Sequence, residues 1–239
     1  MGQSFFIWNG QDCRSMGVNL RGPVPIVRPE ERVRHVEIPG VSGDLTETEG
    51  ENIYNSYIQT ASISVRGGFR VRDVYNWLRG TGYVTFSGEP DRRQAARIIG
   101  AVTLNRHSRN LDKWEGEVQF YCQPLKQLLR EDKITIGSIG ASVRNNGDVT
   151  CRPMWKVTVA SGKTSISLTA GGKTIAVTGL TGGSVIWIDS DVMEIMNSDK
   201  TQMLTKNSVG DFPELAVGNN TVSGSNWASI EIEKRERYL

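Results

Sequence analysis

The chain has 239 residues, enough for one large domain or for two modest domains that each bury a hydrophobic core. Its 28 basic and 26 acidic residues nearly balance, which argues against a dedicated nucleic-acid-binding protein. No apolar run approaches the roughly 18 residues of a membrane span, and the N-terminus lacks the basic start and apolar stretch of a cleavable signal peptide. We therefore expect no membrane insertion.

The cysteines and histidines are few and scattered. Cys13, Cys122 and Cys151 lie far apart, whereas a disulfide framework or a four-ligand zinc site needs more or closer cysteines. We predict reduced, partly buried thiols in a protein that folds in cytoplasm. His35 and His107 have no partner at the spacing of a metal site or a catalytic triad. The sequence therefore predicts no metal and no cofactor.

The first unusual segment along the chain is the acidic stretch GDLTETEGEN at residues 43–52. It carries Asp44, Glu47, Glu49 and Glu51 without a basic residue. Such a composition is typical of a long exposed loop, or of an arm that becomes ordered only against a partner.

Strand and helix patterns follow in the next fifty residues. ASISVR at 61–66 alternates with period two, which places Ile63 and Val65 on the buried face of a strand. RVRDVYNWLRG at 70–80 spaces its apolar residues as the stripe of an amphipathic helix, and Gly80 is suited to end that helix. We predict a helix of two to three turns lying on a sheet.

The stretch SGEPDRR at 87–93 resembles an active site at first sight. Glu89 and Asp91 lie beside Arg92 and Arg93, and these cations stabilise both carboxylates in the charged form, so neither carboxyl is suited to donate a proton near neutral pH. Pro90 fixes its own φ and favours a bend between strands. Catalysis is the alternative, but nothing else in the sequence supplies a partner. We interpret the stretch as a turn.

Two further segments have ambiguous patterns. Fair helix propensity marks DRRQAARII at 91–99, although this segment could instead belong to the flanking strands. A short linker helix could form in PLKQLLRED at 124–132. Between them, DKWEGEVQFYCQ at 112–123 alternates strictly and predicts a half-buried strand with Val118 and Phe120 on its inner face.

The use of basic residues changes near the middle of the chain. Residues 1–130 contain 15 Arg and 2 Lys, whereas residues 131–239 contain 4 Arg and 7 Lys. We place a domain boundary between about 125 and 145 and divide the chain into residues 1–135 and 136–239. Arginine suits interfaces because its planar fork binds carboxylates at two points and stacks on aromatic rings. The first domain is therefore expected to make protein contacts.

The second half predicts a β-sandwich. Short strand-like runs stand at 155–159, 164–169, 173–177, 184–189 and 227–234, with glycine-rich turns between them. IDSD at 188–191 lacks the glycine and terminal glutamate of an EF-hand loop, so we interpret Asp189 and Asp191 as a solvated turn. No phosphate-binding loop and no nucleophile elbow occur. We predict that the protein is not an enzyme.

Taken in order, several segments resemble the distal tail protein family of long-tailed bacteriophages. In the first half they are FFIWNGQDCRSMGV, IPGVSGDLTETEG, RDVYNWLRGTG, FSGEPDR and GEVQFYCQP. In the second half they are NNGDVTCRPMWKV, GGKTIAVTGL, VIWIDSD, GDFPELAVGNNTV and IEIEKRERY. Their order and spacing cover more than 200 residues.

This resemblance implies a mainly β protein with two β-sandwich domains. The N-terminal one would be tail-tube-like with a flanking α-helix, and the C-terminal one galectin-like or carbohydrate-binding-like. It further implies a hexameric ring that joins the tail-tube protein to the tail-tip protein and to receptor-binding proteins, with a central channel for DNA. The protein would be a virion component that assembles in the host cytoplasm. No catalytic residue follows from the resemblance.

A ring requires a heterologous contact, in which one patch meets a different patch on the neighbouring subunit. We predict an interface between the acidic stretch and the arginine-rich surface, formed by Glu47, Glu49, Glu51, Arg70, Arg92 and Arg93.

A carbohydrate-binding module that attaches to host cell-surface glycans is the alternative function. Trp155 and Trp187 alternate in phase with valines, which predicts that both lie in the core. Trp227 follows a polar turn and is the one ring expected to be free for glycan contact.

Overall fold

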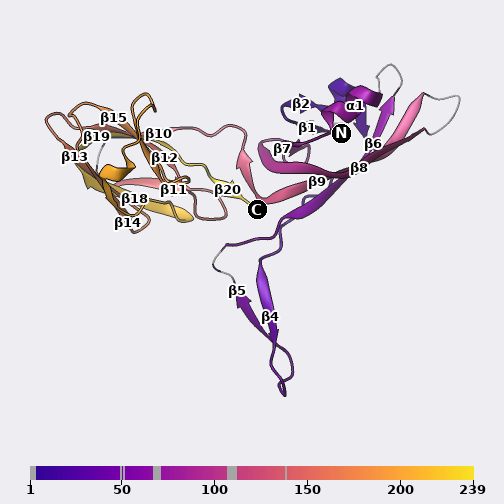
Figure 1. Ribbon diagram of the computed structural model, residues 1–239, viewed down its shortest axis with the longest axis horizontal. Helices are drawn as coiled ribbons and strands as arrows, with labels where there is room; N and C mark the ends of the chain where they lie inside the picture. Colours follow the sequence, from indigo (N-terminus) through magenta and orange to yellow (C-terminus); the bar gives the residue numbers. More distant parts are fainter. Residues whose placement is uncertain (1–3, 49, 51, 67–70, 107–111, 138) are drawn as a thin grey trace. The chain divides into compact units, whose positions relative to one another are not determined.

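The computed structural model describes residues 4–48, 50, 52–66, 71–106, 112–137 and 139–239. The chain divides into two compact units, residues 1–129 with Leu239 and residues Arg130–Tyr238. Both units are built mainly of β-strands (Figure 1). Each has its own cluster of buried apolar residues. The mainly β fold predicted from the sequence is confirmed.

The described residues of the N-terminal unit form one main sheet, one α-helix and a separate hairpin. Its strands are β1 (Phe6–Trp8), β2 (Gln11–Asp12), β3 (Val18–Leu20), β4 (Val33–Glu37), β5 (Asp44–Thr48), β6 (Tyr57–Arg66), β7 (Thr81–Phe86), β8 (Arg92–Arg106) and β9 (Lys113–Leu128). A 3₁₀ turn, η1, spans Cys13–Met16, and the helix α1 spans Val71–Trp77. The main sheet runs in the order β2-β1-β7-β8-β9-β6-β3, and β4 pairs with β5 alone.

The core of this unit follows the predicted alternation along β9. Val118, Phe120 and Cys122 are buried, whereas Glu117 and Gln119, which alternate with them, are exposed. Aromatic rings gather around Phe120, whose ring centroid lies 5.5–5.6 Å from the rings of three other aromatic residues: Phe6, Trp8 and Phe86. This spacing is typical of favourable edge-to-face and tilted aromatic pairs.

The helix α1 supplies part of the same core. Val74 and Leu78 are buried, as the stripe predicts, whereas Tyr75 is 39% exposed. The Tyr75 hydroxyl accepts a hydrogen bond from the Leu104 N–H at 3.2 Å and so contacts β8. The predicted short helix is confirmed.

Three expectations for local structure differ from the fold. Residues 92–99 belong to β8, which pairs with β7 on one side and β9 on the other, and residues 124–128 continue β9. Residues 44–48 form β5 rather than a loop, because they pair with β4 over five residues. In each case pairing with a neighbouring strand outweighs a weak local preference.

The C-terminal unit is a two-sheet sandwich. Its strands are β10 (Ile134–Ile136), β11 (Ala141–Asn145), β12 (Met154–Val159), β13 (Ser165–Ala170), β14 (Lys173–Thr178), β15 (Val185–Asp189), β16 (Glu194–Asn197), β17 (Ser208–Gly210), β18 (Gly218–Ser225), β19 (Trp227–Glu233) and β20 (Arg237–Tyr238), with a 3₁₀ turn, η2, at Thr205–Asn207. One sheet has the order β10-β19-β12-β15-β16 and the other β11-β18-β13-β14-β17.

Both sheets contribute to one core. Trp155, Ile188 and Ile230 come from the first sheet, Leu168 and Ile175 come from the second, and all five are fully buried. Alternation along each strand places these residues on the inner faces, as expected for packed sheets. The predicted sandwich is confirmed for this unit.

Candidate interaction surfaces and a buried ionic network

The stretch at 87–91 is a turn between β7 and β8. The Glu89 carboxylate lies between two cations, the Lys126 ammonium at 2.6 Å and the Arg92 guanidinium at 3.0 Å. Lys126 is 5% exposed, so this pair fastens the turn onto β9. A carboxylate that two cations hold in this way serves the scaffold, which agrees with the structural interpretation of the stretch.

The predicted interface arginines lie at the same end of β8. Arg92 is engaged by Glu89, and the Arg93 guanidinium carbon stacks 4.5 Å above the centre of the Tyr83 ring. Stacked arginines keep their outward N–H groups available for carboxylates. Arg70 lies outside the described residues, as do Glu49, Glu51 and His107.

The acidic arm, defined here as residues 30–55, contains the hairpin β4–β5 (Figure 1). All five residues of β5 are exposed, and Glu47 stands opposite Arg34 on β4. Three apolar side chains of the arm are also exposed: Ile38, Val41 and Leu45.

Charge is distributed unevenly within the N-terminal unit. The acidic arm has seven acidic and two basic residues, whereas the rest of residues 1–129 has 14 basic and seven acidic residues. The arm is therefore strongly negative and the body of the unit strongly positive. Opposite surfaces of this kind attract over roughly a Debye length, about 8–10 Å at physiological salt.

The tryptophans of the C-terminal unit are arranged differently from the expectation. Trp155 is fully buried as predicted, but Trp227 is only 6% exposed and belongs to the core. A register shift between Thr158 and Val159 brings Val159 opposite Trp227, and this bulge turns the ring inward. The sequence pattern could not show the bulge. The glycan contact predicted for Trp227 would therefore have to use a ring with little exposed surface.

Trp187 is the more accessible ring. Trp187 lies with Val185 on the outer face of β15, because the alternating residues Ile186 and Ile188 are buried on its inner face. The Lys200 ammonium lies 4.0 Å from the ring centre, and the indole N–H donates to the Ser198 carbonyl at 3.0 Å. The alternation was correctly recognised, but its inner and outer faces were assigned the wrong way round.

Asp189 does not lie in a solvated turn, which corrects that interpretation. It is 5% exposed, and its two carboxylate oxygens bind the Arg235 guanidinium at 2.7 and 3.0 Å. Burial, the largest single influence, would raise the pKa of Asp189, but the hydrogen bonds from Arg235 and from backbone N–H groups together hold that pKa below its usual value. Asp189 is therefore a charged, paired group at neutral pH.

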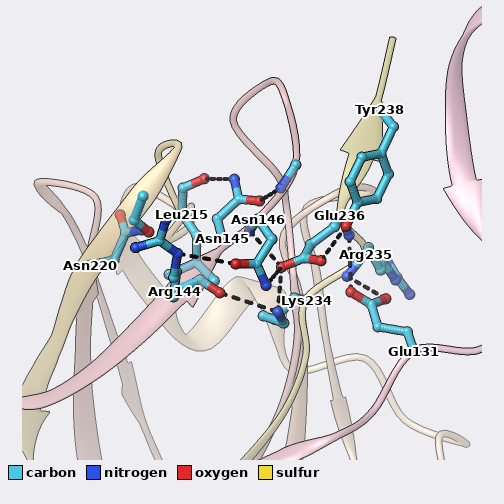
Figure 2. A network of polar contacts seen from close by, with 12 residues as sticks. Glu131, Arg144, Asn145, Asn146, Leu215, Asn220, Lys234, Arg235, Glu236 and Tyr238 are labelled. Atoms are coloured by element: carbon cyan, nitrogen blue, oxygen red, sulfur yellow. Dashed lines mark hydrogen bonds and ion pairs between the residues drawn. The ribbon is translucent and has the colours of Figure 1, made fainter.

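A second carboxylate clamps the end of the chain, as Figure 2 shows. The two oxygens of Glu131 accept the backbone N–H groups of Arg235 and Glu236 at 2.8 and 3.0 Å. Arg235 has a φ of 55°, so its backbone is left-handed and presents two successive N–H groups to one anion.

The Glu236 carboxylate lies at the centre of the network in Figure 2. It accepts the Tyr238 hydroxyl at 2.7 Å and the Asn146 backbone N–H at 2.8 Å, and it pairs with the Lys234 ammonium. Burial pushes the pKa of Glu236 upward most strongly, but these donors together keep it below its usual value. The sequence pattern IEIEKRERY gave no signal that these charges would be buried.

The three cysteines are buried and form no disulfide. Burial raises the pKa of Cys122 and that of Cys151 to about 12, and it also raises the pKa of Cys13. Within the described residues, no group of His, Cys, Asp and Glu side chains is arranged to hold a metal ion. No described helix is long and apolar enough to cross a membrane.

Comparison with known proteins gives two findings. Residues 146–238 match the family described as siphovirus-type tail component, C-terminal domain. The whole chain superimposes on the crystal structure of the phage SPP1 protein Dit (gp 19.1), with a TM-score of 0.80, 17% identity and 100% of both chains covered. That protein is described as a paradigm of the hub adsorption apparatus in phages that infect Gram-positive bacteria. No curated protein matches the sequence.

Residues 146–238 therefore match the C-terminal domain of siphovirus-type tail components. Over its full length the chain has the Dit fold, since a likeness at this identity establishes the fold. The resemblance to distal tail proteins predicted from the sequence is confirmed by these two matches.

Proposed function

We propose that this protein is a structural virion protein that forms a ring at the distal end of a phage tail. The ring joins the tail tube to the tip or baseplate and its receptor-binding apparatus, and its central channel lets DNA pass. The full-length likeness to a hub adsorption protein carries this proposal. The number of six subunits comes from the family resemblance.

The charge distribution of the N-terminal unit supports self-association. A ring interface is heterologous, so one protomer must offer a surface that complements a different surface of its neighbour. The acidic arm and the basic body of this unit are such a pair. We assign Glu47, Glu49 and Glu51 to the acidic side, and Arg70, Arg92 and Arg93 to the basic side.

The exposed apolar residues of the acidic arm add to the same argument. Ile38, Val41 and Leu45 leave apolar surface in water that contact with a neighbour would bury. Burial of apolar surface contributes roughly 25 cal/mol per Å², so three such side chains favour contact by a few kcal/mol at most. The charges then orient the arm and accelerate the encounter.

Mass measurement of the purified full-length protein tests the proposal. Light scattering should give a mass about six times that of the 26.4 kDa chain, and negative-stain images should show ring-shaped particles. A protein that stays monomeric at all concentrations should form rings when tail-tube or tip protein is added. Persistence of the monomer in both conditions contradicts a ring.

Charge-reversal variants test the predicted interface separately from the formation of a ring. The triple variant E47K/E49K/E51K should assemble less, and raising the salt concentration should weaken assembly of the wild type, because exposed charges are screened. D199K, on an exposed turn of the C-terminal unit, is the matched control and should assemble as the wild type does. Unchanged rings in the triple variant would move the interface elsewhere.

A further inference from the structure

An amine and an amide meet on one buried carboxylate in the C-terminal unit. Lys234 is 7% exposed and Glu236 is 3% exposed, and the Lys234 Nζ is hydrogen-bonded to Glu236 Oε1. The side-chain Nδ2 of Asn146 donates to that same oxygen at 3.4 Å. Figure 2 shows the Lys234 and Asn146 side chains reaching Glu236 together.

The surrounding contacts hold each of the three groups in place. Lys234 Nζ also donates to the Arg144 carbonyl at 3.1 Å, and the other Glu236 oxygen accepts the Tyr238 hydroxyl at 2.7 Å. The backbone N–H of Asn146 binds Glu236 Oε1 at 2.8 Å, which fixes the start of the exposed turn after β11.

A cation lies on the carbonyl side of the same amide. The Arg144 guanidinium Nε donates to Asn146 Oδ1 at 3.1 Å. Attack on the amide carbon would develop negative charge on Oδ1, and a positioned donor at this distance stabilises such an oxyanion. The site thus holds a nucleophile, a proton carrier in contact with both nitrogens, and an oxyanion donor.

We propose that Lys234 and Asn146 form an intramolecular isopeptide bond, with Glu236 as the proton carrier. The Lys234 ammonium gives a proton to Glu236, and the neutral amine attacks Cγ of Asn146. The new Nζ–Cγ bond forms, the Cγ–Nδ2 bond breaks, and Glu236 passes a proton from Nζ to Nδ2 so that ammonia leaves. No electrons are exchanged, so no oxidant or reductant is required.

The bond would close a covalent loop from residue 146 to residue 234. That loop contains β12 to β19, eight of the strands in the sandwich. A cross-link over a long loop stabilises a domain mainly by restricting the unfolded chain, as a disulfide does. This unit has one cysteine, Cys151, which is free and offers no such link. A pulling force applied at both ends of the unit would bypass strands β12 to β19, whatever assembly the protein enters.

The intact mass of the denatured full-length protein decides the question. We expect a mass lower than that of the sequence by one ammonia per chain, and a protease digest that contains a branched peptide joining Lys234 to Asn146. A mass equal to that of the sequence overturns the proposal. Ring formation does not enter this measurement, so its result is independent of the proposed function.

A succinimide at Asn146–Gly147 would also release one ammonia and must be distinguished. Hydroxylamine cleaves the chain at a succinimide but leaves an isopeptide bond intact. We expect no cleavage at residue 146 and a branched peptide that survives treatment. Cleavage there, with a linear peptide that contains Lys234, overturns the proposal.

Variants test the roles of Lys234 as the nucleophile and of Glu236 as the proton carrier. K234R and E236Q should regain the full sequence mass, whereas K173R, at the exposed pair with Glu214, should keep the ammonia loss. Circular dichroism checks that each variant folds. Ammonia loss that persists in folded K234R overturns the assignment of the nucleophile, and persistence at an unchanged level in folded E236Q overturns the role of the carboxylate.

Discussion

The two units of this protein use charged residues in different ways. In the N-terminal unit the acidic residues concentrate in an exposed arm, and basic residues dominate the remainder. In the C-terminal unit Asp189, Lys234 and Glu236 are buried, each with a partner of opposite charge. Exposed and segregated charges favour association with another molecule, whereas buried and paired charges fix one arrangement of the chain.

This difference suggests where each unit is sensitive to change. A surface charge in the N-terminal unit can be altered with little effect on folding, because exposed pairs contribute about 0–1 kcal/mol. The buried charges of the C-terminal unit, Asp189, Lys234 and Glu236, cannot lose their partners without leaving an unpaired ion shielded from water.

The largest expected effect tests whether the two cores are independent. Phe120→Ala removes the ring that contacts Phe6, Trp8 and Phe86, and it should lower the free energy of unfolding of the N-terminal unit by about 3–5 kcal/mol. Leu168→Ala is the counterpart in the C-terminal unit. Calorimetry should show that each variant shifts a different transition. One shared transition that both variants move equally would show that the units unfold as one.

The next effect sharpens the contrast between buried and exposed pairs. Arg235→Met leaves the Asp189 carboxylate buried without its guanidinium, and we expect a loss of about 3 kcal/mol in urea unfolding. Lys133→Met breaks the exposed pair with Glu231 and should cost less than about 1 kcal/mol. Equal losses in the two variants would argue against a distinct role for the buried pair.

Acid should weaken the C-terminal unit through Asp189. The pKa of this carboxyl is lower in the folded state, so the stability it contributes is present above the unfolded pKa of about 3.9 and is lost as pH falls through the folded pKa. The melting temperatures of the wild type and D189N should therefore converge between pH 5 and pH 2. A constant difference over that range would contradict the assignment.

The smallest effect concerns the thiols, which both units bury alike. With a pKa of about 12, Cys122 and Cys151 hold a thiolate fraction of only about 1 in 10⁴ at pH 8. Iodoacetamide should label the native protein slowly and the urea-unfolded protein fully, as mass spectrometry would show. Rapid labelling of a native thiol would reveal local opening at that cysteine.

The strand pattern was the most predictable part of the fold. Strict alternation identified β9 and the sandwich strands, because one face of each packs against a core while the other meets water. The pattern failed where contacts with other strands decided which face of a strand is buried. Trp187 was expected in the core but lies on the outer face of its strand, because the inner face had been assigned wrongly. Trp227 was expected to be exposed but is buried, because a bulge turns its ring inward.

The candidate sites were less predictable than the fold. Glu47 and the turn at Glu89 stand out in the sequence because their charges are local, and the structure keeps Glu47 exposed and Glu89 in a turn. The contact of Asn146 with Glu236 joins residues far apart in the chain, and no spacing rule indicates it. Only the topology of the sandwich brings the turn that contains Asn146 close to the end of β19.

The sequence by itself determined the β architecture, the short helix and the uneven distribution of charge, because these depend on local periodicity and composition. Tertiary structure alone decided which charges are buried, which aromatic rings face water, and which amine, amide and carboxylate meet. The physical reason is that burial and pairing depend on contacts between distant segments, and a long-range contact changes the environment of a side chain without changing the pattern around it.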